Sequence, residues 1–128
     1  MPLNTINTSN APQPIGPYSQ AINHKGLLYV SGQIPINPQT GDIPTRIADQ
    51  AHQALDNLLA IITAAGAQVT DVIKNTIYIK NMNDFDTINQ VYSTYFSEPY
   101  PARAVIEVSR LPKDVGIEIE SVVSNANS

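Results

Sequence analysis

The sequence predicts an α+β fold in which two helices cover one face of a β-sheet, and three observations support this prediction. Residues 45–65 and 83–96 carry apolar side chains at helical spacing. Residues 72–80, 102–109 and 117–120 instead alternate apolar with polar side chains, as strands buried on one face do. Two helices can cover only one side of such a sheet, so its other face is expected to be uncovered.

The first 20 residues combine a short strand with a proline-rich loop. Residues 3–7 are expected to form the strand. Residues 11–17 contain three prolines, which restrict the backbone and remove hydrogen-bond donors. We therefore expect an ordered surface loop that presents Tyr18.

A hairpin and a second loop follow. Residues 21–24 and 27–31 flank Lys25-Gly26, a dipeptide typical of hairpin turns. Residues 34–44 hold three further prolines and are expected to be loop and turn.

The two helices are separated by a strand. The first helix, residues 45–65, is expected to end at Gly66, a residue that suits the position after a helix. The second helix covers residues 83–96, with Asn83 as its N-cap. Between them, the strand at residues 72–80 is expected to place on one face Ile73, Ile77 and Ile79.

The C-terminal segments are expected to pair as a final hairpin with charged side chains on one face. Residues 102–109 alternate between two faces of the expected strand. One face carries Ala102, Ala104, Ile106 and Val108. The other carries Arg103, Val105, Glu107 and Ser109. In residues 117–120, two isoleucines alternate with Glu118 and Glu120. If the apolar face meets the core, Arg103 and several carboxylates project from the reverse face of the sheet, where we expect the chemistry.

Composition indicates one domain over residues 1–128 and a partly covered surface. Charged residues make up 14% of the chain, the net charge is −4, and cysteine is absent. The acidic balance argues against a broad nucleic-acid surface, and disulfides and thiolate chemistry are excluded. No signal peptide or membrane-spanning apolar run is apparent, so a cytoplasmic protein is expected. The uncovered sheet face and the low charge together predict a homo-oligomer with polar pockets between subunits.

Several motifs resemble those of the RidA (YjgF-type) reactive intermediate or imine deaminases. They extend over nearly the whole chain: Ile15-Gly-Pro-Tyr-Ser-Gln20, Ser31-Gly-Gln-Ile-Pro35, Asn83-Asp-Phe85 with Asn89, and Pro101-Ala-Arg103 through Ile117-Glu118-Ile119. The resemblance implies a chorismate-mutase-like α+β fold with a mixed sheet. It also implies a homotrimer with the sheets inward and the active sites between subunits.

The implied reaction is hydrolysis of 2-iminobutanoate and 2-iminopropanoate to 2-oxo acids and ammonia, without a cofactor or metal. These imines arise from enamines that pyridoxal-phosphate-dependent dehydratases release. By resemblance, Arg103 clamps the substrate carboxylate and Glu118 orients or deprotonates water. By the same resemblance, the backbone of Val105 helps to hold the substrate. Many relatives carry cysteine at this position, so a thiol-dependent mechanism is excluded here and Val105 can contribute only through its backbone. The remaining pocket positions implied are Tyr18, Ser31, Gly32 and Asn89.

The residues alone leave simpler explanations open. Arg103 could be an interfacial salt-bridge partner, Tyr18 a loop anchor, and Asn89 an exposed helix residue. If Ser109 pairs with Gly116 in the final hairpin, Glu118 would face Glu107 and lie roughly 13 Å along the strand from Arg103. A different register, a bridging substrate or contributions from two subunits would each resolve this offset.

Two other functional classes also remain open. One is a non-catalytic or regulatory trimer that binds 2-oxo acids. The other is an endoribonuclease or translation inhibitor, which the acidic composition disfavours. His24 and His52 have no acidic partner at ligand spacing, so a metal site or a Ser-His-Asp triad is not expected.

Overall fold

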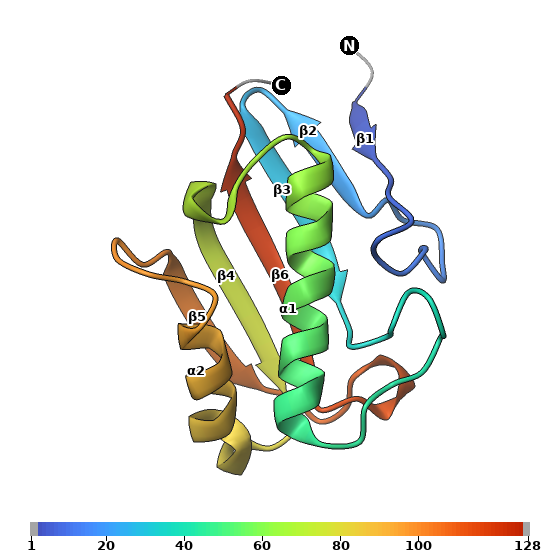
Figure 1. Ribbon diagram of the computed structural model, residues 1–128, viewed down its shortest axis with the longest axis vertical. Helices are drawn as coiled ribbons and strands as arrows, with labels where there is room; N and C mark the ends of the chain where they lie inside the picture. The colour runs from blue at the N-terminus through green and yellow to red at the C-terminus, as the bar shows by residue number, and fades with distance from the viewer. Residues whose placement is uncertain (1–2, 127–128) are drawn as a thin grey trace.

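The computed structural model describes residues 3–126, which form one mixed six-stranded sheet with both α-helices on the same face (Figure 1). The sheet order is β1-β2-β3-β6-β4-β5, and only β4 and β5 run parallel. The strands are β1 (Asn4–Ile6), β2 (Ala21–His24), β3 (Leu27–Gln33), β4 (Val72–Ile79), β5 (Ala102–Glu107) and β6 (Ile117–Ser124). The predicted first strand and first hairpin are therefore confirmed.

Both predicted helices are present but shorter. Helix α1 spans Ile47–Ala64 and α2 spans Phe85–Ser93. Gly66 takes a left-handed backbone conformation (φ +86°) after α1, as predicted, and its N–H donates to the Thr63 carbonyl. Three short 3₁₀ turns complete the chain: η1 (Val69–Asp71), η2 (Met82–Asp84) and η3 (Pro112–Asp114).

The prediction of Asn83 as an N-cap is wrong. Residues 82–84 form the turn η2, and the capping side chain is that of Asn81, which accepts a hydrogen bond from the Asn83 N–H. Asp84 precedes α2 but makes no side-chain capping bond. The chain therefore enters α2 through a tighter turn than helical spacing alone predicts.

The main core lies between α1 and the centre of the sheet. Leu55, Leu58 and Ile62 of α1 are almost fully buried, as are Ile117 and Ile119 of β6. Strand β6 lies in the middle of the sheet, between β3 and β4, and its helix-facing side is completely buried.

The predicted final hairpin is wrong. Strand β5 does not pair with β6; it pairs in parallel with β4, and α2 forms the crossover between these two strands. The connection at residues 108–116 then carries the chain past β4, so that β6 enters between β3 and β4. Glu118 consequently lies opposite Tyr78 of β4, not opposite Glu107.

The predicted faces of β5 are reversed. Arg103 lies over rings of α2 and Val105 packs against the main core, so both face the helices. Ile106 points to the uncovered face and is 43% exposed. The edge position explains this reversal, because a long arginine side chain beneath the short helix α2 can still reach solvent at the sheet margin.

The strand β4 contains a second departure from simple alternation. Its register with β6 shifts between Val72 and Lys74, so Ile73 falls in the irregularity and is exposed. Asn75 instead occupies the helix-facing position before Ile77 and is fully buried.

Candidate active site

One group of functional side chains gathers where β5 passes beneath α2. The Arg103 guanidinium lies 4.8 Å (Cζ) from the ring centre of Tyr92 and 5.8 Å from that of Phe85. Its Nη1 donates a 2.7 Å hydrogen bond to Oδ1 of Asn89. We call these four residues the arginine half-site.

The spacing of α2 explains why its three members meet one guanidinium. Phe85, Asn89 and Tyr92 are separated by four and three residues, which places them on one face of the helix. The parallel ladder places Arg103 beside Asn75, and Asn75 also faces α2 because its amide bonds the Tyr92 hydroxyl. Helix and strand thus present complementary side chains to each other.

A cleft of about 330 Å³ opens next to this guanidinium. It is lined by Asn89, Tyr92, Ser93, Tyr100, Pro101 and Arg103. Within residues 3–126, Nη1 is the only guanidinium nitrogen of Arg103 that has a hydrogen-bond partner. The remaining donors can therefore bind an anionic group that enters the cleft.

A second group lies around Glu118 on β6. Gly32 is so close to Glu118 that a Cβ atom at position 32 would overlap the carboxylate. The pairing of β3 with β6 is irregular between Val30 and Gln33, the short segment that contains Ser31 and Gly32. Bulges of this kind locally redirect a strand, and glycine there leaves room for the carboxylate.

Two further predicted residues adjoin this position. Tyr18 and Gly32 line the same small hollow, and the Tyr18 hydroxyl accepts a 3.3 Å hydrogen bond from the Ile15 N–H. The Ser31 hydroxyl donates to the Ser19 carbonyl at 2.6 Å, which makes it a poor nucleophile. We call Tyr18, Ser31, Gly32 and Glu118 the glutamate half-site.

The electrostatics of Glu118 suit a proton acceptor. Burial, reinforced by the nearby charge of Glu120, raises the pKa of Glu118 above its ordinary value of 4.5. Tyr78 donates its hydroxyl to Glu120, whereas no hydrogen bond from within residues 3–126 holds the Glu118 carboxylate. Glu118 is therefore free to bind a water molecule or a ligand.

In a single chain, the two half-sites do not meet. Arg103 faces the helices, whereas Glu118 faces the uncovered side, because its neighbours Ile117 and Ile119 are buried beneath α1. Strand β4 also separates β5 from β6, which puts the two strands roughly 10 Å apart. The structure thus brings the predicted residues together in two sets, not one.

Val105 belongs to neither set by its side chain. It packs against the main core beside Ile77. Strand β5 is the last in the sheet order, so its outer backbone edge has no strand partner in the part of the chain described. A backbone contribution from Val105 therefore stays a prediction.

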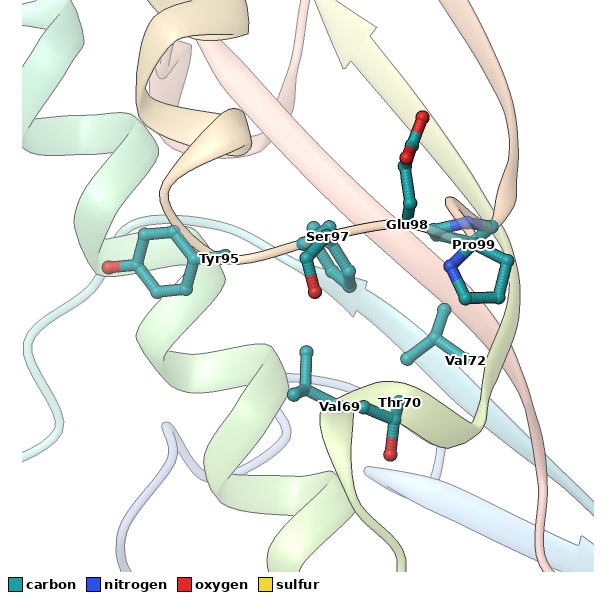
Figure 2. A pocket seen from close by; sticks show the side chains of 9 residues that line it. Val69, Thr70, Val72, Tyr95, Ser97, Glu98 and Pro99 are labelled. Carbon is teal, nitrogen blue, oxygen red and sulfur yellow. The ribbon is translucent and has the colours of Figure 1, made fainter.

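Another hollow, of about 40 Å³, lies at the far end of α2 (Figure 2). Figure 2 shows Val72 and Pro99 grouped together, with the Glu98 carboxylate directed away from them and the Tyr95 ring directed toward α1. The hollow is small and brings no opposed titratable groups together, so it offers little chemistry.

The aromatic members of the arginine half-site were missed at the level of sequence. Phe85 and Tyr92 fit the apolar stripe of a helix, and that pattern predicts only core residues. The signal that could have found them is the presence of Asn89 on the same helical face. A polar amide between two aromatic residues is unusual for a purely structural stripe.

Comparison with known proteins places this arrangement in context. A sequence model of the family described as Endoribonuclease L-PSP matches residues 8–125. This chain belongs to that family. A 2-iminobutanoate/2-iminopropanoate deaminase of Escherichia coli K12 is 50% identical over 121 residues, which cover 92% of this chain and 94% of that protein.

Solved structures of the family show the same fold. The crystal structure of E. coli TdcF with bound serine superposes with a TM-score of 0.92 at 47% identity, covering 95% of this chain and 98% of that one. RidA from an Antarctic Psychrobacter superposes with a TM-score of 0.92 at 40% identity, covering 94% and 98%. The predicted RidA-type fold and family are thereby confirmed, and the names of the relatives support the expectation of a deaminase.

Two features are absent from residues 3–126, namely a helix that could span a membrane and a cluster of side chains that could hold a metal ion. Neither helix is long and apolar enough to cross a bilayer. No cluster of three or more histidine, aspartate or glutamate side chains there is arranged to hold a metal ion.

Proposed function

We propose that this protein hydrolyses small 2-imino acids, such as 2-iminopropanoate and 2-iminobutanoate, to 2-oxo acids and ammonia. The observation that carries the proposal is the Arg103 guanidinium, which Asn89 and Tyr92 hold at the rim of an open cleft. Within residues 3–126 only its Nη1 has a hydrogen-bond partner, so its other N–H groups can bind a ligand. A guanidinium in this state matches the two oxygens of a substrate carboxylate. The TdcF structure, whose ligand serine also carries a carboxylate, supports the same recognition.

The chemistry needs positioning and proton transfer. The carbon of a protonated imine is already electrophilic, so water can add to it directly. Glu118 accepts a proton from this water as the carbon–oxygen bond forms, giving a carbinolamine. The same carboxyl group returns the proton to nitrogen, and the carbon–nitrogen bond then breaks to release ammonia. As the carbonyl forms, Glu118 takes the hydroxyl proton and passes it to this ammonia. One water is consumed and one ammonium ion is released.

The raised pKa of Glu118 is consistent with this role. A carboxylate with a higher pKa is a stronger base, and burial raises the pKa of Glu118 above its ordinary value. Gly32 leaves the space in which the carboxylate sits, and Tyr18 forms the adjoining wall.

We further propose that the site is assembled from two neighbouring protomers of a homotrimer. The arginine and glutamate half-sites lie on opposite faces of the sheet, so one chain cannot direct both at the same small substrate. The uncovered face carries exposed apolar side chains, including Tyr29 (48% exposed) and Ile106 (43%). Packing these faces against copies of themselves would bury them and bring one chain's edge strand near the next chain's β6.

Replacing Arg103 tests the proposed reaction. A pyridoxal-phosphate-dependent dehydratase would generate 2-aminoacrylate from serine, and the release of pyruvate and ammonia would be followed. The wild-type protein is expected to accelerate this release, and Arg103→Ala to return it to the spontaneous rate. Arg103→Lys keeps the charge but not the paired geometry, and should raise KM about tenfold or more.

Other outcomes would point to other functions. Binding of 2-oxobutanoate by a wild-type protein that adds nothing to the spontaneous rate would contradict catalysis and favour a binding role. The family description also includes the word endoribonuclease. Salt-dependent cleavage of RNA by the purified oligomer would favour that activity, although the net charge of −4 opposes it.

A further inference from the structure

A chain of buried polar groups runs beneath the arginine half-site. Ser121 of β6 donates its hydroxyl to Oδ1 of Asn75, and Nδ2 of Asn75 donates to the Tyr92 hydroxyl at 2.9 Å. The exposed fractions of Ser121, Asn75 and Tyr92 are 4%, 0% and 6%. Strands β6 and β4 and helix α2 are therefore connected by hydrogen bonds inside an otherwise apolar core.

Such a chain is an unexpected feature of a core that is chiefly isoleucine and leucine. Burying a polar side chain is costly unless its hydrogen bonds are made, and an apolar pair would serve packing equally well. Every buried side-chain nitrogen and oxygen in residues 3–126 has a partner. The network is complete, so it fixes the orientation of the groups it joins.

This series of hydrogen bonds ends at Tyr92, the aromatic ring over which the guanidinium lies. The hydroxyl of Tyr92 is fixed by Asn75, and the ring face lies 4.8 Å from Cζ of Arg103. Asn75 is also the ladder neighbour of Arg103 on the adjacent strand. The strand that supports the arginine backbone thus also orients the surface beneath its side chain.

Asn89 completes the constraint from the other side. Its Oδ1 accepts a hydrogen bond from Nη1, while the ring of Tyr92 lies 4.8 Å from Cζ of the guanidinium. The hydrogen bond and the ring contact together restrict the orientation of the guanidinium. An exposed arginine without such contacts would sample many rotamers, which would have to be lost on binding.

We propose that Tyr92, anchored through Asn75 to Ser121, is a positioning residue that orients the Arg103 guanidinium for the substrate carboxylate. This inference rests on the proposed function, since it concerns the same clamp. The new element is that Tyr92, which need not touch the substrate, orients the guanidinium that does. Such preorganisation lowers KM, because the arginine side chain then loses less conformational entropy when the carboxylate binds.

Tyr92→Leu and Tyr92→Phe separate positioning from packing. Leucine removes the ring face, and we expect about tenfold weaker binding of the probe 2-oxobutanoate, a rise in KM and little change in kcat. Phenylalanine keeps the ring face but lacks the hydroxyl that bonds Asn75, so this variant should bind the probe about threefold more weakly than wild type and more tightly than Tyr92→Leu. If Tyr92 had a purely structural role, both variants would have a lower melting temperature but would bind 2-oxobutanoate as tightly as wild type.

Tyr95→Leu is the matched control. Tyr95 lies three residues further along, and its hydroxyl donates to Asp56 at 2.7 Å, away from the arginine half-site. This variant should lose stability but bind 2-oxobutanoate as tightly as wild type. Unchanged probe binding by folded Tyr92→Leu would overturn the inference.

Nuclear magnetic resonance of the wild-type protein gives a test that needs no variant to fold. The Arg103 guanidinium signals should show a ring-current shift and slowed rotation about the Cζ–Nη bonds. Averaged signals typical of a free arginine would overturn the inference. Because probe binding and these signals are measured without turnover, they remain decisive even if imine hydrolysis is not found.

Discussion

At the scale of single residues, the environment of Glu118 determines what the protein can do with a proton. The carboxyl group is half-buried beside Gly32, and its pKa is raised by burial first and by Glu120 second. Arg103 has the opposite character: it is an exposed cation whose position is fixed by neighbours on α2. One residue is suited to transfer protons and the other to hold a carboxylate.

Replacing Glu118, the proposed base, should separate these roles. Glu118→Gln keeps the size of the side chain but removes its ability to accept a proton. We expect a fall in kcat of about a hundredfold, with the Kd for 2-oxobutanoate nearly unchanged. Steady-state kinetics and calorimetry measure the two quantities. A kcat equal to that of wild type would remove Glu118 from the mechanism.

The raised pKa also predicts a pH dependence of stability. Between pH 4.5 and the raised pKa, the folded protein binds more protons at Glu118 than the unfolded chain does. The free energy of unfolding should therefore fall as pH rises through this interval, and the contribution is fully present only below it. Urea unfolding at several pH values should show this decline in wild type and a flatter curve in Glu118→Gln. Parallel curves for the two proteins would contradict the assignment.

At the scale of elements, the irregular segment of β3 controls the position of the Glu118 carboxylate, the proposed base. Gly32 lies in this segment against Glu118, and the partner strand β6 continues without a break. The geometry of two strands, rather than a flexible loop, thus sets where the base sits.

A methyl group at position 32 tests this dependence. In Gly32→Ala the new Cβ would overlap the Glu118 carboxylate, which must then move. We expect kcat to fall about tenfold with a small change in melting temperature. Gly26→Ala is the control: it has φ +79° and open space around it, so it should cost about 1 kcal/mol of stability without affecting kcat. Full activity in Gly32→Ala would show that the carboxylate position is not critical.

Local patterns in the sequence were sufficient to predict most elements but not the pairing of the last two. Both helices, the first hairpin and the alternation of β6 follow from periodicity within each segment. The alternation of β4 follows only beyond its irregularity, and the predicted position of Ile73 on the buried face was wrong. The partner of β5 does not, because a parallel pair formed across α2 looks the same in sequence as a strand leading into a hairpin. The face of Arg103 was wrong for the same reason, since an edge strand can carry apolar residues on its outer face.

The candidate site was predicted to a similar extent. The resemblance supplied Arg103, Glu118 and their neighbours, and the structure groups them into two sets. Tyr92 shares a helical face with Asn89, which is the one signal of its role in the sequence. Asn75 could not be predicted, because its importance comes from a contact between a strand and the helix that lies over it. Such a contact leaves no spacing pattern in the chain.

At the scale of the whole molecule, the one-sided helical layer leaves a sheet face that a single chain does not cover. Figure 1 shows α1 and α2 on the same side of the sheet. Ile106 and Tyr29 lie on the other side with large exposed fractions. Light scattering should give the mass of a trimer, and a monomer at micromolar concentration would contradict the proposed assembly.

The most direct test of the central claim mixes two inactive variants. Arg103→Ala lacks the carboxylate clamp and Glu118→Gln lacks the base, so each alone should be inactive. If neighbouring protomers supply the two groups, random mixed trimers should recover about a quarter of the wild-type activity, because one interface in four then holds both intact residues. Recovery near this level supports the shared site. Mixed trimers that remain as inactive as the separate variants would contradict it.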